Sequence, residues 1–323
     1  VESLHLVHVA VVSADGALLA RWGDADWLTG YRSAAKPFQA LPLVEDGVVD
    51  RFHLLPGELA LTAASHNGEE EHLMGVREIL RKVGMPEEAL RLGALAPLRG
   101  ETAESVYRSG LPIEPIHNNC SGQHAAMLGL AKIHGWPMES YLEPNHPLQR
   151  RMLMEMARYT GLGEWEIQTM PDGCGMVAFA VPLRNMARSF AALGKLAGEE
   201  EGPSRVLGAM ISHPFMVGGT GRLCTHLMEA TGGRIVGKLG AEGVYGMSVP
   251  GEGLGIALKV QDGVMRAGDA AAIRVLDLLG LLEGEEAQAL ERFRRSAVRN
   301  TLGEEVGEVS ANFDLKLEGA TGP

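Results

Sequence analysis

The fold is decided by the stretch RIVGKLGAEGVYGMSVPGEGLGIALKV, which occupies residues 234–260. Its β-branched and aromatic residues occur in short runs that are separated by glycine-containing turns. This pattern predicts strands over 234–239, 244–249 and 254–260, and a further short strand is expected over 264–267. Strands this close together along the chain favour antiparallel pairing.

The other end of the chain carries a second set of strand signals. Residues 5–12 alternate and are rich in β-branched side chains, Ala14-Asp15-Gly16 is typical of a turn, and residues 17–22 can return as a second strand. Both ends of the chain therefore supply strands, whereas the region between them is mostly helical in pattern.

The remaining signals fix the fold class. No regular alternation of strand and helix and no fixed-period repeat is present, which argues against a Rossmann sheet. We therefore predict an α+β fold, in which an antiparallel sheet from the N- and C-terminal strands is covered by helices and the middle region is mostly helical. Residues 1–316 are expected to form one domain with a helical middle insertion, and 317–323 a loose tail. Helices are predicted from Ala34 and over 69–83, 149–160 and 269–282, with glycine-rich loops at 217–221 and 251–255.

Composition limits the classes of function. The chain has 323 residues, of which 46% are hydrophobic and 22% charged, and its net charge is −12. Such a composition is typical of a globular protein with a sizeable core, and the acidic surface disfavours binding to nucleic acid or to anionic membranes. No apolar run reaches the length of a membrane span, and residues 1–13 lack the pattern of a signal peptide. We therefore expect a cytoplasmic enzyme or binding protein.

The first chemical signal is a Ser-x-x-Lys motif, in which Ser33 and Lys36 stand at the start of a predicted helix. Positions i and i+3 share a helix face, so the lysine amine can approach the serine hydroxyl. A serine hydroxyl is a weak nucleophile at neutral pH and needs such a neighbour to take its proton. The motif also fits a plain helix start, with Ser33 or the residue before it as the cap and the lysine exposed.

Two later segments favour a catalytic role for the Ser-x-x-Lys motif. Ser65-His66-Asn67 follows it, and Lys238-Leu239-Gly240 lies on a predicted strand. Serine acyl enzymes of the penicillin-binding type combine Ser-x-x-Lys, Ser-x-Asn and Lys-Thr-Gly in the same order. The order predicts two Ser-Lys pairs that face one pocket. One pair would attack the substrate, the other would polarise the substrate or deliver a proton to the leaving amine, and backbone N–H groups would stabilise the oxyanion. The alternative for Ser65 is the cap of the acidic helix that follows.

With these motifs in place, the sequence resembles the Rhizobium etli-type L-asparaginase II family over about residues 5–315. The resemblance implies hydrolysis of L-asparagine to L-aspartate and ammonia, a fold similar to serine β-lactamases and glutaminases, and a homodimer. It also implies that Ser33 and Lys36 form one catalytic pair and Ser65 and Lys238 the other, without deciding which serine is acylated. The segments that carry it are RSAAKP at 32–37, SHNG at 65–68, NNCSG at 118–122, DGCG at 172–175 and GKLGAEG at 237–243.

The same resemblance implies a metal site, usually zinc, whose ligands would be Cys120, Cys174 and the residue at position 123. The family has lysine at that third position, whereas this chain has Gln123. An amide oxygen is a weaker zinc ligand than a neutral amine, so weakened zinc binding is expected unless water or His124 compensates. Without the resemblance, the two cysteines read as buried thiols, and Cys224 reads as a packed structural cysteine.

Substrate binding needs further polar groups. An asparagine substrate presents an α-carboxylate and an α-ammonium, so its pocket requires a cation and an acidic or carbonyl acceptor. Arg32 and Asp172 are the candidates, although Arg32 also fits a surface ion pair and Asp172 a turn. Asn119 and His124 are predicted to line the pocket, and the alternative for His124 is a satisfied core histidine.

Three classes of function therefore stay open. The first is an asparagine amidohydrolase that needs no organic cofactor. The second is a glutaminase or another serine amidohydrolase of β-lactamase-like fold. The third is a noncatalytic amino-acid-binding protein, which has no need for two Ser-Lys pairs. Asparagine and glutamine differ by one methylene, a difference that supports only about 1–3 kcal/mol of selectivity, so composition and motifs do not separate them.

Overall fold

The computed structural model describes residues 1–318, and its contacts group the chain into two compact units. The first unit contains residues 1–34, 180–195 and those from 226 onward. The second contains residues 35–179 and 196–225, which is the region that the sequence predicts to be mostly helical. Across residues 1–318, no helix combines the length and the apolar character that a membrane span requires.

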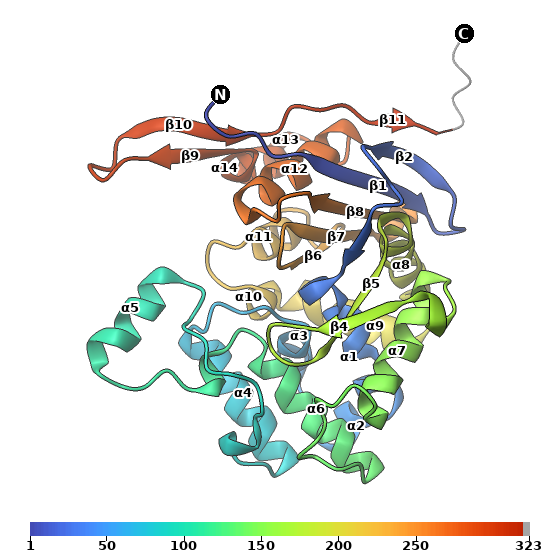
Figure 1. Cartoon of the computed structure of the whole chain (residues 1–323), viewed down its shortest axis with the longest axis vertical. Coiled ribbons are helices and arrows are strands. Elements are labelled where there is room, and N and C mark those ends of the chain that lie inside the picture. Colours follow the sequence, from blue (N-terminus) through green and yellow to red (C-terminus); the bar gives the residue numbers. More distant parts are fainter. Residues whose placement is uncertain (319–323) are drawn as a thin grey trace. The chain divides into compact units, whose positions relative to one another are not determined.

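The first unit is built on a six-stranded antiparallel sheet with the order β11-β2-β1-β8-β7-β6 (Figure 1). The N-terminal hairpin therefore pairs with the C-terminal strands through β1 and β8, from Val7 opposite Val260 to Ser13 opposite Leu254. This confirms the predicted α+β class and the sheet formed from both ends of the chain. The strands are β1 (Val7–Ser13), β2 (Leu18–Trp22), β6 (Val236–Gly240), β7 (Val244–Val249), β8 (Leu254–Val260) and β11 (Lys316–Leu317).

One face of this sheet is covered by α8 (Leu183–Leu196), and glycine makes the close approach possible. A Cβ added at Gly255 would lie 1.9 Å from the carbonyl oxygen of Ala187, and one added at Gly246 would lie 2.0 Å from the ring of Phe190. Any larger residue at these two positions would push the helix off the sheet.

The predicted strand over 264–267 is wrong. Val264 holds the N-cap position of α12 (Met265–Leu278), and its N–H group donates to Oδ1 of Asp262. The apolar residues at 264 and 265 therefore open a helix, which packs on β7 and β8 and starts four residues before the predicted 269. A run of four residues is too short for its periodicity to separate strand from helix.

The first unit also contains short elements outside the main sheet. β9 and β10 form a separate antiparallel hairpin, and β3 pairs with the end of β5 at residues 180–182. Two elements, β5 (Val177–Pro182) and α11 (Leu223–Ala230), begin in the second unit and end in the first. The other bounds are β3 (Leu28–Gly30), α13 (Gly284–Ala289), α14 (Glu291–Arg294), β9 (Arg295–Arg299) and β10 (Glu305–Ser310).

The second unit is a helical cluster around α6, in which every residue from Ser121 to Ala131 is buried. α1, α3, α4 and α7 pack against this helix. The helices predicted over 69–83 and 149–160 are confirmed as α4 and α7. The bounds are α1 (Lys36–Glu45), α2 (Val48–Arg51), α3 (Pro56–Thr62), α4 (Glu70–Val83), α5 (Gly100–Ser109), α6 (Ser121–His134), α7 (Pro147–Thr160), β4 (Gln168–Pro171), α9 (Glu201–Ser212) and α10 (Pro214–Val217).

The expected loose tail over 317–323 falls largely outside the described residues. Leu317, its first residue, lies in β11 and pairs with Ala20 of β2. The positions from 319 to the end are not described.

Candidate active site

The Ser-x-x-Lys motif lies where a 3-10 turn passes into an α-helix. Ser33 is in the turn Arg32–Ala35, and Lys36 is the first residue of α1. The interpretation of Ser33 or its predecessor as the helix cap is wrong, because Ala35 holds the N-cap position without a side-chain hydrogen bond. The lysine is also not exposed: its exposed fraction is 1%.

The turn that carries Ser33 lies against β6 within the first unit. A Cβ added at Gly240 of β6 would be 2.3 Å from the carbonyl oxygen of Tyr31. Lys238, two residues earlier on the same strand, is fully buried, and its Nζ donates to the carbonyl of the next residue at 2.8 Å. The first unit therefore brings the strand of Lys238 beside the turn of Ser33.

Arg32, next to Ser33, adopts a backbone φ of 49°. This left-handed conformation is uncommon for a residue with a side chain and costs roughly 1–3 kcal/mol, and such strain gathers at functional sites. The guanidinium lies 4.0 Å from Oε1 of Glu242, so an ion pair, the alternative considered for this residue, is formed.

The Ser65-His66-Asn67 segment is extended and held on both sides. The N–H groups of Ser65 and Asn67 donate to the successive carbonyls of residues 217 and 218, at 3.1 and 3.0 Å. The N–H group of His66 points the other way and donates to the carbonyl of Asn119 at 3.2 Å. Ser65 does not cap the following helix, because Glu69 holds the N-cap position of α4.

Lys36 connects this segment to the cysteine motifs. Its Nζ donates to the carbonyl oxygen of Ala64, and lies 3.5 Å from Oγ of Ser65 and 3.0 Å from Sγ of Cys120. No carboxylate of residues 1–318 forms an ion pair with this buried amine. The contact between Lys36 and Ser65 joins one member of each predicted Ser-Lys pair, an association that the spacing does not predict.

The catalytic pairs themselves stay predictions. Ser33 and Lys238 belong to the first unit, whereas Lys36 and Ser65 belong to the second. Each predicted pair thus has one member in each unit.

Cys120 and Cys174 are both buried in the second unit, close enough for each thiol to affect the pKa of the other. Cys120 is the residue before α6, and Cys174 lies in the turn after β4. Interaction with Cys174, together with Lys36, lowers the pKa of Cys120, whereas interaction with Cys120 and burial raise the pKa of Cys174. Folding therefore brings these two thiols together, while Cys224 is buried in α11.

The third predicted metal ligand, Gln123, forms a hydrogen bond through its amide nitrogen. Gln123 lies one helical turn after Cys120, and its Nε2 donates to Oε1 of Gln39 at 2.6 Å. Within residues 1–318, no three His, Cys, Asp or Glu side chains are placed to share a metal ion. Two thiols and one amide oxygen are a weak donor set for zinc, and no catalytic step is assigned to a metal.

Zinc binding stays a prediction with a direct test. We expect Gln123→Lys to tighten zinc binding, because the substituted amine supplies a stronger ligand beside two thiols, and Cys120→Ser to weaken it. Zinc is measured by elemental analysis after treatment with a chelator and reloading. Equal and negligible zinc uptake by the parent protein and by Gln123→Lys would contradict the prediction.

His124 is fully buried one turn beyond Cys120. Its Nδ1 pairs with the Tyr141 hydroxyl at 2.7 Å, while its Nε2 has no hydrogen-bond partner in residues 1–318. Burial and the nearby Lys36 lower the pKa of His124 to about 3, so the ring is neutral at physiological pH. The alternative interpretation, a core histidine whose hydrogen bonds are satisfied, therefore holds for Nδ1 but not for Nε2.

Asp172 closes the turn that presents Cys174. Its carbonyl accepts a hydrogen bond from Gly175 at 2.9 Å, and its Oδ1 accepts one from Gly173 at 2.7 Å. Asp172 is therefore a turn residue that accepts backbone hydrogen bonds, as the alternative interpretation predicts. Its predicted contact with substrate, like those of Arg32, Asn119 and His124, stays a prediction.

Glu69 anchors a network that the motifs do not reveal. Its carboxylate accepts hydrogen bonds from the backbone N–H and hydroxyl of Thr220 at 2.8 and 2.7 Å, from Asn67 at 3.0 Å and from Arg99 at 2.6 Å. Burial alone would raise the pKa of Glu69, but these hydrogen bonds lower it to about 2. The network ties the Ser65 segment to the glycine loop after α10.

We expect Glu69→Gln to lower the free energy of unfolding by about 2 kcal/mol near neutral pH, because a neutral amide loses the charge-assisted bonds. The folded-state pKa is depressed, so the contribution of Glu69 is complete above pH about 4.5 and is lost as the pH falls toward 2. Denaturant unfolding of both proteins from pH 7 to pH 3 measures this.

Glu101→Gln is the matched control. Glu101 pairs with the same arginine but its side chain is 80% exposed, so its replacement should change stability by less than about 0.5 kcal/mol. Equal losses in the two variants, or a pH-independent loss in Glu69→Gln, would contradict the assignment.

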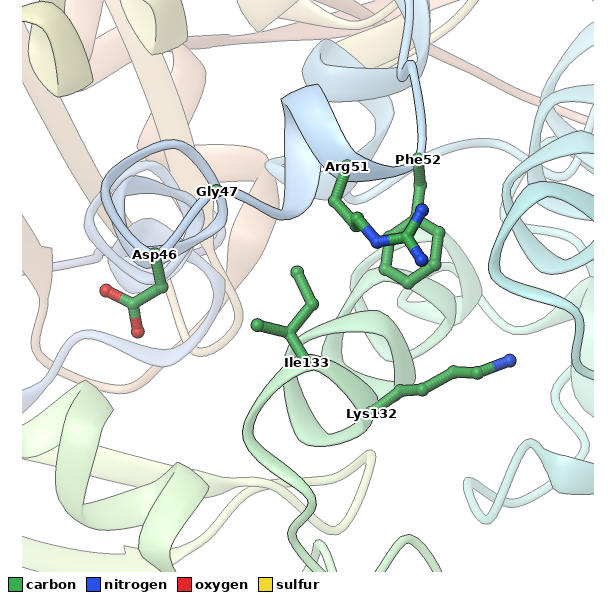
Figure 2. Close-up of a pocket in the computed structure, with 6 residues that line it drawn as sticks. All are labelled: Asp46, Gly47, Arg51, Phe52, Lys132 and Ile133. Carbon is green, nitrogen blue, oxygen red and sulfur yellow. The ribbon is translucent and has the colours of Figure 1, made fainter.

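A surface pocket of about 500 Å³ also lies in the second unit (Figure 2). It is at the ends of α1 and α6 that are opposite Lys36 and Cys120, roughly 15 Å away along α1. Its carboxylate, Asp46, is already paired with Arg151 and His134. None of its residues belongs to the motifs, so it is separate from the candidate site; they are Asp46, Gly47, Arg51, Phe52, Lys132 and Ile133.

The chain was compared with known protein families. Residues 1–311 match L-asparaginase II, and the chain belongs to that family. A comparison with curated proteins gave no match.

Solved structures share low sequence identity with the chain. Mglu in its tris and glutamate form is 18% identical, with a TM-score of 0.40, over 87% of this chain and 61% of that chain. A β-lactamase from Mycobacterium bovis is 14% identical, with a TM-score of 0.38, over 84% of this chain and 94% of that chain. Simvastatin synthase from Aspergillus terreus is 13% identical, with a TM-score of 0.40, over 79% of this chain and 86% of that chain. The matched region spans about two thirds or less of the length of Mglu.

Proposed function

We propose that the protein is an L-asparagine amidohydrolase that releases ammonia and L-aspartate through a serine nucleophile. The observation that carries the proposal is Lys36, a buried amine in contact with Ser65 and without a carboxylate partner in residues 1–318. Burying an amine without an opposite charge costs free energy, and here the amine belongs to the motif that serine acyl enzymes use. Membership in the L-asparaginase II family supports the substrate class.

In the proposed reaction, Ser33 attacks the side-chain amide carbon of asparagine. Lys36 takes the hydroxyl proton, so that the bond from Oγ to carbon forms without a charged alkoxide. Backbone N–H groups stabilise the oxyanion of the tetrahedral intermediate. Ser65 and Lys238 then deliver a proton to the departing nitrogen, which leaves as ammonia. Water releases aspartate from the acyl-enzyme by the reverse sequence of proton transfers.

Ammonia release tests the proposal. The purified protein is assayed with L-asparagine, with L-glutamine and with a chromogenic β-lactam. We expect turnover of asparagine that exceeds turnover of glutamine, and no hydrolysis of the β-lactam. Preferential glutamine turnover would replace asparagine by glutamine as the substrate, and failure with both amides would overturn the amidohydrolase assignment. The cytoplasmic location and the homodimer stay predictions that this assay does not address.

A further inference from the structure

The loop after α10 is fixed against the Ser65 segment. Its carbonyls at 217 and 218 accept the two backbone hydrogen bonds described above, and the carbonyl of Thr220 accepts a third from Nδ2 of Asn67 at 2.8 Å. Gly219 has a φ of +105°, and a Cβ at that position would lie 2.5 Å from Oε1 of Glu69. A side chain would not fit there, so the close approach of the loop to Glu69 requires glycine.

This loop ends in an arginine that has no ion-pair partner. Nη1 of Arg222 donates to Oδ1 of Asn67 at 3.4 Å, and no carboxylate of residues 1–318 lies within 4 Å of its guanidinium. Its side chain is nevertheless half-buried. In the same described range, the other arginines without a carboxylate partner are all exposed: Arg51, Arg91, Arg150, Arg188, Arg266 and Arg292.

The acidic residue in this network does not neutralise Arg222. Both oxygens of Glu69 are occupied by Arg99, Thr220 and Asn67. A guanidinium removed from much of the solvent and left without an anion is costly, particularly in a chain whose net charge is −12. The charge of Arg222 is therefore available for an anionic ligand.

The position of Arg222 relates it to the nucleophile segment. The N–H groups of Ser65 and Asn67 point to one side and that of His66 to the other, which is the alternation of an extended strand. Side chains two residues apart in such a segment project to the same face, roughly 6.6 Å apart. Arg222 is bound to the second of these side chains, while Lys36 contacts the first.

We propose that Arg222 binds the α-carboxylate of the amino-acid substrate, while Asn67 and the Glu69 network position its guanidinium. This inference rests on the proposed function and adds the group that selects free amino acids over other amides. An arginine can hold a carboxylate through two parallel N–H···O bonds. Arg32, the cation suggested by the sequence, already has Glu242 beside it, whereas Arg222 has no such partner.

The test compares L-asparagine with 3-aminopropanamide, which has the same amide and amine but lacks the α-carboxylate. We expect Arg222→Gln to lower kcat/KM for asparagine about 100-fold, mainly through KM, and to change kcat/KM for 3-aminopropanamide less than threefold. Arg222→Lys, which keeps the charge, should recover about tenfold of the loss. Arg150→Gln, at an exposed arginine of the same unit, is the matched control and should equal the parent protein.

Two results would overturn the assignment. One is an asparagine kcat/KM within threefold of the parent in Arg222→Gln. The other is an equal loss with both substrates, which would indicate a structural role. If Arg222→Gln does not fold, Arg222→Lys decides, because a selective loss with asparagine supports the proposal and an equal loss contradicts it.

A binding measurement separates this inference from the proposed function. Absence of ammonia release by the parent protein overturns the function but leaves the anion site to be measured by calorimetry with L-aspartate and with β-alanine, which lacks the α-carboxylate. Arg222→Gln should weaken L-aspartate binding about 100-fold and leave β-alanine unchanged. Equal behaviour of L-aspartate toward the parent and Arg222→Gln would overturn the role of Arg222.

Discussion

Ser33→Ala is expected to abolish asparagine turnover while preserving the fold. The change removes one hydroxyl from a 3-10 turn in which Ser33 caps no helix, so stability has little reason to fall. The lost hydroxyl is, however, the atom that would form the acyl bond. Loss of the nucleophile should lower kcat by several orders of magnitude, and Lys36→Met should be nearly as damaging. Steady-state ammonia release measures both.

Ser204→Ala serves as the control for this prediction, because Ser204 is exposed on α9. It should retain the activity of the parent protein. Retention of more than about a tenth of the parent kcat in Ser33→Ala, a loss below 1.4 kcal/mol, would remove Ser33 from the role of nucleophile.

Ser65 and Lys238 are expected to act as one unit. Each single variant, Ser65→Ala and Lys238→Met, should lower kcat about 100-fold or more, because either change breaks the proton path to the leaving nitrogen. The double variant should then be little worse than either single variant. The comparison uses kcat of the four proteins under saturating asparagine.

Additive losses would contradict this second prediction, since they would show that the two residues work apart. Lys132→Met provides a control for the removal of a lysine, because Lys132 lies at the far end of α6 and donates to the carbonyl of Val83. Its kcat should match that of the parent protein.

Much of the fold can be predicted because its signals are local. The hairpin over 5–22 and the three strands within 234–260 alternate or are bounded by glycine turns, and each of them forms. The strand predicted over 264–267 does not form, because the local signal there is too short to distinguish a strand from a helix. Four apolar residues do not define a period, and the hydrogen bond from the backbone of Val264 to Asp262 begins a helix instead.

The candidate site is less predictable because its contacts are long-range. Ser33, Lys36, Cys120 and Cys174 stand out through their motifs, and the contact of the two cysteines follows from the resemblance. The bonds of Glu69 to Thr220 join residues 151 positions apart, and Glu69 by itself is typical of the first turn of a helix. Nothing local to Gly219 or Arg222 identifies their partners, although the glycine run at 217–221 marks a constrained loop.

The most direct test of the account is the location of the covalent intermediate. The protein is mixed with saturating L-asparagine, quenched rapidly in acid, digested and examined by peptide mass spectrometry. We predict an aspartyl ester on the peptide that contains Ser33, and no ester in Ser33→Ala. An ester on Ser65, or ammonia release by the parent protein without any ester, would contradict the account.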